Sequence, residues 1–156
     1  MVRLALLVGL LPLPVNIGIG QDDPNKEDLA KLQGKWELVS ALYDGKPSPP
    51  SPFPGKEIWT FAKNKVFYPP PRTEDGKVAG PSPEAEITLV PGKKPKAMDI
   101  RVVRKGKEPK IGKTIYAFDG DQLKFCVDAT GKGRPEVFES KTGSGRNLII
   151  LKRIKE

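Results

Sequence analysis

Short segments in which apolar and polar residues alternate recur from residue 36 to near the C-terminal end of the chain. Alternation with a period of two places one set of side chains on each face of a β-strand. The segments that show it are residues 36–42, 58–61, 66–68, 87–90, 98–103, 114–118, 122–127, 137–138 and 147–151. Asp119-Gly120-Asp121 joins two of them, and Asp-Gly between such strands is a strong hairpin signal. About eight to ten short, closely spaced strands predict a β-sandwich or a β-barrel.

The segments between the strands carry helix and loop signals. Residues 25–32 predict a short helix, because Asp23 or Asn25 provides an N-cap and Gly34 follows the end. Residues 46–55 contain five prolines (47, 49, 50, 52 and 54), and residues 69–71 are three more. Because proline cannot donate a backbone hydrogen bond to a sheet, both proline-rich segments are predicted to be loops or strand edges.

The first twenty residues have the three parts of a secretory signal peptide. Arg3 gives a positive start, residues 4–11 are apolar, and Gly18 and Gly20 are small residues one and three places before Gln21. The apolar run is shorter than the roughly 20 residues needed to span a bilayer. Since the only cysteine is Cys126, none lies at the cleavage site to carry a lipid anchor. We therefore expect a signal peptide over residues 1–20, one domain over 21–156, and a secreted, periplasmic or cell-envelope location.

The chain has no histidine and only one cysteine, and this composition excludes several kinds of catalytic and metal site. The chain has no residues for a Ser-His-Asp triad, a Cys-His pair, a Cys-x-x-Cys motif or a histidine metal site. Glu84 and Glu86 are close in sequence, so an enzyme that uses only carboxylates stays open, but residues two apart on a strand usually share a solvated face. We predict no enzymatic activity, no metal and no cofactor. Cys126 is expected to be buried.

Several stretches in a fixed order resemble a known family. They are residues 34–40, which begin with Gly34-x-Trp36, and residues 94–100, 115–126, 134–135, 140–145 and 148–153. With these stretches the chain is similar to an uncharacterised lipocalin-like domain family of planctomycete bacteria. The resemblance implies an all-β fold: a lipocalin-like, up-and-down antiparallel barrel of about 8–10 strands with a short N-terminal helix. It also implies that Gly34, Trp36 and Arg153 close one end, with the guanidinium of Arg153, or failing that Lys152, over the indole ring.

Basic residues are concentrated between residues 93 and 113, in a chain of net charge +8. Six of them are candidates for a face that binds an anionic partner: Lys93, Lys94, Lys96, Arg101, Arg104 and Lys105. Such a face suits a lipid headgroup or an acidic polysaccharide. The alternative is a solvated outer wall whose charges prevent edge-to-edge pairing of strands. Nucleic acid is not expected, because the stretch has no interleaved aromatic residues.

Two functions fit these observations. In the first, the barrel is a binding module for a small apolar ligand or an envelope component, with lumen candidates Trp59, Phe61, Met98, Tyr116 and Phe118. In the second, the chain is a structural or interaction protein of the cell envelope that uses its basic face or its proline-rich loops. An interior cavity above about 300 Å³ would favour the first function, whereas a filled interior would favour the second. We expect a monomer with no membrane-spanning segment.

Overall fold

A computed structural model describes residues 24–49, 51 and 55–155, so the expected signal peptide lies outside the described residues. One helix, α1 (Pro24–Leu32), precedes the strands. The strands are β1 (Gly34–Tyr43), β2 (Lys46–Pro47), β3 (Ile58–Ala62), β4 (Lys65–Phe67), β5 (Glu84–Val90), β6 (Ala97–Val102), β7 (Lys110–Asp119), β8 (Gln122–Asp128) and β9 (Arg146–Arg153). None of the described residues form a helix that is long and apolar enough to span a membrane.

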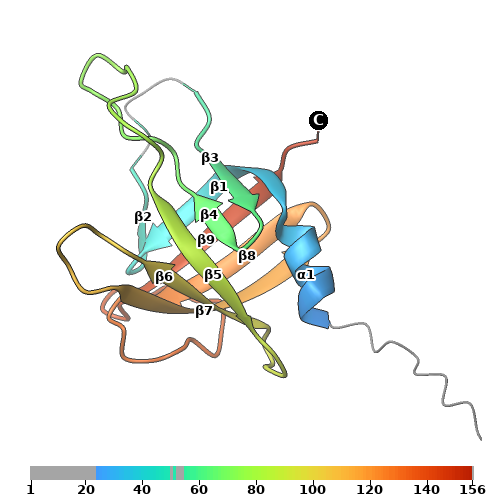
Figure 1. Ribbon diagram of the computed structural model, residues 1–156. Helices are drawn as coiled ribbons and strands as arrows, with labels where there is room; N and C mark the ends of the chain where they lie inside the picture. The colour runs from blue at the N-terminus through green and yellow to red at the C-terminus, as the bar shows by residue number, and fades with distance from the viewer. Residues whose placement is uncertain (1–23, 50, 52–54, 156) are drawn as a thin grey trace, which may run out of the picture.

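The sheet is a closed antiparallel barrel (Figure 1). From β3 to β9 each strand pairs with its neighbour in sequence, and β1 pairs with both β3 and β9 to complete the circle. The closed barrel therefore has eight strands. The two-residue β2 pairs only with the end of β1. The predicted all-β, lipocalin-like barrel with a short N-terminal helix is confirmed.

One predicted strand is wrong. Residues 137–138 lie in the long connection between β8 and β9 and form no strand. Both edges of β8 are already paired, with β7 and with β9, so no ladder is free to accept another strand there. Pro135 also removes a backbone donor from this segment, and the side chain of Val137 is exposed.

The first strand contains an irregularity that changes which side chains point inward. The register between β1 and β9 shifts between Leu38 and Ser40. A bulge of this kind moves the following residues to the opposite face of the strand. Trp36 is buried as expected, but beyond the bulge Ala41, and not Leu42, joins the buried core. Strict alternation over residues 36–42 would place Leu42 inward with Trp36, and the bulge gives that position to Ala41 instead.

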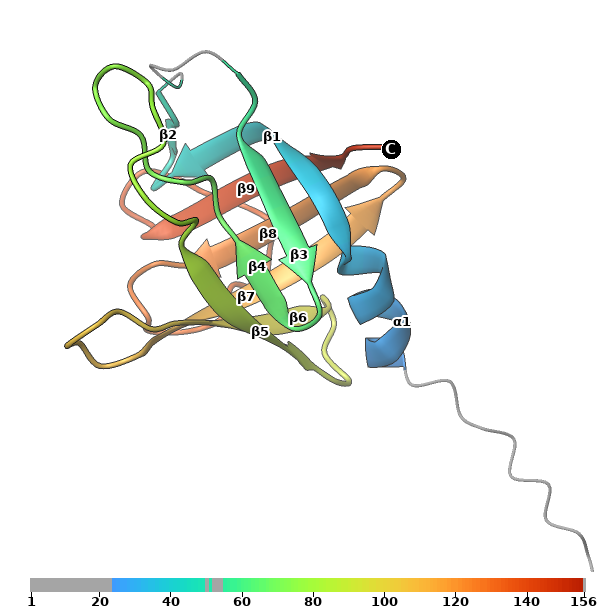
Figure 2. The ribbon, with the colours of Figure 1, turned by 45° about the horizontal axis from the view of Figure 1, so that its top comes forward.

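Helix α1 lies across one end of the barrel (Figure 2). The turns β3–β4, β5–β6 and β7–β8 lie at this closed end, because the strands run alternately up and down. The opposite end carries the β1–β2 turn, the β4–β5 connection with residues 69–71, the β6–β7 connection and the long β8–β9 connection. We call this opposite end the mouth.

Residues 129–145, which connect β8 to β9, cover part of the outer wall. The guanidinium of Arg134 donates to the carbonyls of Met98 and Thr114 and forms an ion pair with Asp99. Beneath this connection Cys126 is completely buried, and its thiol lies 3.5 Å from the carbonyl oxygen of Glu139. Burial raises the pKa of the Cys126 thiol. The predicted burial of Cys126 is confirmed, on the outer side of the sheet rather than in the lumen.

Candidate functional site

Three residues seal the closed end of the barrel. The guanidinium carbon of Arg153 lies 4.2 Å from the centre of the Trp36 ring, which is the arrangement that the resemblance implies. Arg153 also donates to the carbonyls of Lys31 and Gln33, which tie the last strand to the end of α1. At Gly34, φ is +109° and an added Cβ would lie 3.4 Å from an Arg153 nitrogen, so the turn into β1 favours glycine.

A buried polar contact fixes the helix onto the same end. The carboxylate of Asp28, from α1, is 4 % exposed. It accepts a hydrogen bond of 2.7 Å from the Tyr116 hydroxyl and one of 2.8 Å from the Lys96 ammonium group. Burial and the neighbouring Asp28 carboxylate raise the pKa of Tyr116, so this hydroxyl stays protonated and remains a donor. The contact thereby joins α1 to β7 and to the residue before β6.

The closed half of the lumen is filled by side chains. Trp36 packs edge-on against Phe61 and at a tilt against Phe118, with ring centres 6.5 Å and 6.4 Å apart. Phe118 also packs edge-on against Tyr116. Met98 is 1 % exposed in the same cluster. The lumen candidates Phe61, Met98, Tyr116 and Phe118 therefore point inward but form packed core.

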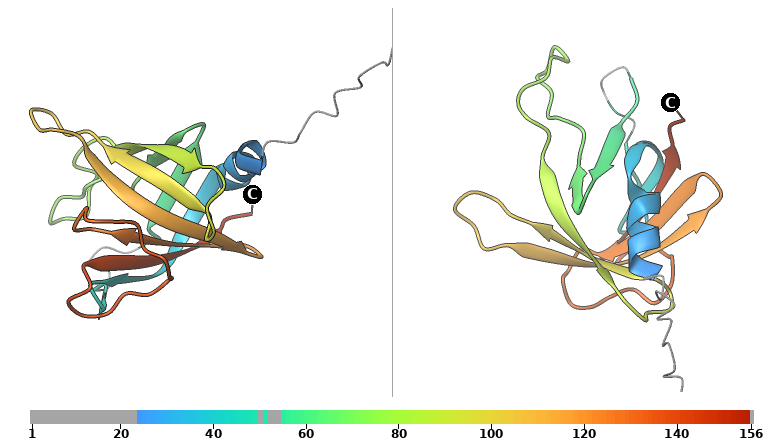
Figure 3. Two further views of the ribbon diagram at one scale, coloured as in Figure 1. Left: turned by 90° about the horizontal axis from the view of Figure 1, so that it is seen from below. Right: turned by 45° about the vertical axis from the view of Figure 1, so that its right-hand side comes forward.

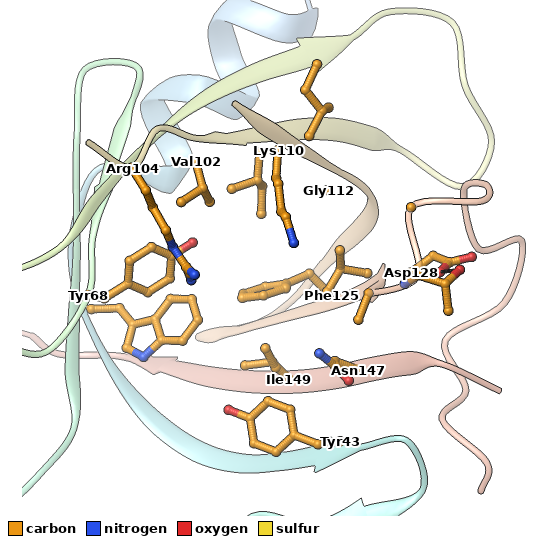
Figure 4. Close-up of a pocket in the computed structure, with 17 residues that line it drawn as sticks. Tyr43, Tyr68, Val102, Arg104, Lys110, Gly112, Phe125, Asp128, Asn147 and Ile149 are labelled. Atoms are coloured by element: carbon orange, nitrogen blue, oxygen red, sulfur yellow. Dashed lines mark hydrogen bonds between the residues drawn. The ribbon is translucent and has the colours of Figure 1, made fainter. Parts of the chain in front are cut away.

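The mouth half of the lumen contains a cavity of about 690 Å³ (Figure 4). Trp59 is the one lumen candidate among its described lining residues. The Trp59 ring lies 4.7 Å from the Tyr68 ring, which it meets edge-on, and 5.5 Å from the Phe125 ring. Ile100 and Ile149 add aliphatic surface. These side chains give the cavity an apolar floor.

Positive charge lies on one side of this cavity. Arg104 and Lys110, at the two ends of the β6–β7 connection, both reach over the apolar floor in Figure 4. Neither side chain has a hydrogen bond or an ion pair with another described residue. Asp128 lies on the other side, where hydrogen bonds from Thr130 hold the pKa of its carboxyl group below the usual range. The rim of the cavity is therefore cationic at β6–β7 and anionic at the end of β8.

The rim next to β1 is held by close contacts. The Asp44 carboxylate accepts a 2.7 Å hydrogen bond from the Gly145 amide, and this bond lowers the pKa of Asp44. The amide of Gly45 donates to the Ser140 hydroxyl at 2.8 Å. Gly45 has φ of +78°, and an added Cβ would lie 2.2 Å from the Thr142 nitrogen. The β1–β2 turn and the end of the β8–β9 connection are therefore packed together, which fixes this part of the mouth.

The six predicted anionic-partner residues do not form one face. Lys93, Lys94 and Lys96 belong to the β5–β6 turn at the closed end, whereas Arg104 and Lys105 follow β6 at the mouth. Arg101 lies between them on the outer wall and forms a 3.1 Å ion pair with Glu86. Strand β6 separates the two groups, because a strand places its two ends at opposite ends of the barrel. This part of the sequence-based interpretation is corrected.

The acidic residues considered as an acid/base pair lie on the outer wall. Glu84 and Glu86 are exposed, and each forms an ion pair, with Lys65 and Arg101 respectively. Among the described residues, Asp128 is the one carboxylate in the lining of the cavity. The described part of the chain also contains no group of three histidine, cysteine, aspartate or glutamate residues placed to hold a metal ion.

The fold and the cavity together define a closed antiparallel β-barrel with one sealed end and one hollow end. Searches of protein-family models, curated proteins and solved structures find no match to the chain. The resemblance to planctomycete lipocalin-like domains therefore stays a prediction.

The residues that line the mouth were largely missed by sequence reasoning. The alternation within strands identifies inward-facing residues, but it does not show how far along the barrel each one lies. One signal was present. If Trp36 and Arg153 mark the closed end, the opposite ends of all strands in an up-and-down barrel must surround the mouth. That rule points to Tyr68, Val102, Lys110 and Asn147, which the structure places around the cavity.

Proposed function

We propose that this protein is an exported, non-catalytic binding module that holds an amphiphilic anion, such as a long-chain carboxylate, in the barrel mouth. The observation that carries the proposal is the pairing of an apolar cavity of about 690 Å³ with Arg104 and Lys110 at its rim. A filled interior would have favoured a structural role. The volume is above the roughly 300 Å³ that small-molecule sites need.

The floor of the cavity suits the apolar part of the ligand. Trp59 and Phe125 are less than a tenth exposed, yet both contribute surface to the cavity. A hydrocarbon chain placed against these rings and Ile149 would leave water, which is favourable by about 25 cal/mol for each Å² of apolar surface buried. Two aromatic side chains in fixed contact also lose little conformational entropy on binding.

The rim suits an anionic head group. Arg104 and Lys110 have no ionic partner among the described residues, so a bound anion would not have to displace a carboxylate from them. Asp128 stays ionised on the opposite side and repels an anion there. The head group is therefore directed to the β6–β7 side, where charge-assisted hydrogen bonds are about twice as strong as neutral ones.

Export and the lack of catalysis are parts of the same proposal. Export is supported by the secretory pattern of residues 1–20. A binding role is supported by the cavity lining, in which Asp128 is already engaged by Thr130 and no second described carboxylate faces it. Hydrolysis of the glycosidase kind uses a pair of carboxylates that flank one bond.

Displacement of cis-parinaric acid tests the proposal, with energy transfer from Trp59 as the signal. Oleate and oleyl alcohol are then compared as competitors, because they share a hydrocarbon chain and differ in charge. We expect R104Q/K110Q to weaken oleate binding on the order of tenfold or more, since two charge-assisted contacts are lost. Binding of oleyl alcohol should change less than about twofold.

Two further variants serve as controls. K93Q/K94Q removes the same charge at the closed end and should leave the binding of both competitors unchanged. V102W places a large ring in the cavity lining and should abolish the binding of both. The proposal is wrong if cis-parinaric acid does not bind, or if R104Q/K110Q weakens oleate and oleyl alcohol equally.

A further inference from the structure

The β6–β7 hairpin extends away from the barrel beside the mouth (Figure 3). Its connection and the first residues of β7 carry five basic side chains: Arg104, Lys105, Lys107, Lys110 and Lys113. Glu108 is the single acid between them. None of the five forms an ion pair with another described residue, whereas Lys65, Arg101 and Lys152 on the wall are each paired with a carboxylate. The hairpin therefore keeps its positive charge unneutralised.

Two large apolar side chains are exposed on the same hairpin. Val103 is 55 % exposed and Ile111 is 52 % exposed. Ile111 pairs with Arg101 in the β6–β7 ladder, so Arg101, Val103 and Ile111 lie on the outer face of the hairpin. If this face were only a solvated outer wall of the barrel, charged side chains would suffice and exposed apolar side chains would not be needed. Exposed apolar residues between cations are the composition of surfaces that enter a lipid interface.

We propose that residues 103–113 dock the mouth of the barrel onto an anionic lipid bilayer. The lysines contact the headgroups, and Val103 and Ile111 enter the boundary between headgroups and acyl chains. An acidic polysaccharide would use the charges, but it has no apolar layer to receive these two side chains. Docking uses Lys105, Lys107 and Val103, which lie outside the lining of the cavity, and Ile111, which also lines it. Loss of docking in K105Q/K107Q is therefore distinguishable from loss of the proposed ligand binding.

Co-sedimentation with vesicles tests this docking. The full chain is mixed at 0.1 M NaCl with phosphatidylcholine vesicles that contain either 30 % phosphatidylglycerol or none. We expect binding only to the anionic vesicles. K105Q/K107Q should weaken it on the order of 25-fold, because each basic residue near an anionic surface contributes about fivefold. Binding should also fall at 0.5 M NaCl, where the screening length is shorter.

Matched variants separate the hairpin from charge in general. K93Q/K94Q removes the same amount of charge, but from the closed end and not from the hairpin. Its binding should therefore stay within about twofold of the unmodified chain. V103S/I111S keeps every charge and should weaken vesicle binding several-fold while leaving retention on dextran sulfate unchanged. V102W, which fills the cavity, should bind vesicles normally even though it binds no oleate.

Three results would overturn the docking proposal. The first is no binding to the anionic vesicles. The second is an equal loss of binding in K93Q/K94Q and K105Q/K107Q, which would mean attraction by net charge alone. The third is unchanged vesicle binding in V103S/I111S, which would favour a soluble polyanion as the partner. Circular dichroism of each variant checks the fold, and all four substituted hairpin positions are exposed.

Discussion

The two ends of the barrel are built from the same strands, but inward-facing side chains are packed against each other at the closed end and border a cavity at the mouth. At the closed end, Arg153 and Asp28 each make contacts with two or more partners, and the aromatic rings fill the lumen. At the mouth, Arg104 and Lys110 lie beside a cavity and have no described ionic partner. Alternation therefore determines which face is inside, while capping contacts and side-chain size determine whether the inside is core or cavity.

The largest difference is expected from truncating an aromatic side chain at each end. Trp36 is 1 % exposed, so Trp36→Ala should lower the free energy of unfolding by about 3–5 kcal/mol. Tyr43 lines the mouth and is 41 % exposed, so Tyr43→Ala should cost about 1 kcal/mol or less. Urea denaturation followed by circular dichroism measures both. Equal losses would show that the two ends do not differ in packing.

The next largest effect concerns two neighbouring cations of β9. Arg153→Met removes the stacking on Trp36 and the bonds to two carbonyls, and we expect it to cost about 1–3 kcal/mol. Lys152→Met removes an exposed ion pair, 3.7 Å long, with Asp121 and should change stability by less than about 0.5 kcal/mol. If Lys152→Met lowered the free energy of unfolding as much as Arg153→Met, the contacts of Arg153 with Trp36 and with the end of α1 would have no special role in stability.

A smaller effect is expected from removing one hydroxyl group at each end. Tyr116→Phe deprives the buried Asp28 carboxylate of a donor and should cost about 1–2 kcal/mol. Tyr68→Phe should be close to neutral, because no hydrogen bond joins this hydroxyl to another described residue. Thermal unfolding of both variants makes the comparison. A stable Tyr116→Phe variant would mean that Lys96 alone satisfies Asp28.

The smallest effect appears only at high pH. Burial raises the pKa of Tyr68 from 10.0 to about 12. Between these two values the unfolded chain loses the proton and the folded chain keeps it, so the free energy of unfolding falls as the pH rises through this window. Below about pH 10 the group has no effect. Absorbance titration of the phenolate should therefore give a later transition for the native chain than for the urea-unfolded chain, and Tyr68→Phe should remove part of the difference.

The sequence predicts local features of this fold well, and it predicts poorly the features that depend on distant strands. The strands and the helix were predictable because each depends on local alternation or on local capping signals. The contact between Trp36 and Arg153 was expected only from the family resemblance, since the two residues are far apart in sequence. The bulge after Leu38 was not predictable, since it arises from the fit between β1 and β9, which are far apart in sequence. The division of the basic stretch between two ends was predictable in principle, but only once β6 was treated as the spacer between Lys96 and Arg104.

The pairing of β1 with β9 also has a consequence for how the chain folds. From β3 to β9, every ladder joins strands that are neighbours in sequence, so each needs at most one connecting segment to close, the longest being residues 68–83 and 129–145. The β1–β9 ladder instead joins the first strand of the chain to the last one. Of all the ladders it therefore has the greatest entropic cost of loop closure. We expect it to form last, since contacts between distant residues slow folding. The meeting of Trp36 and Arg153 would then mark the step at which an open sheet becomes a barrel.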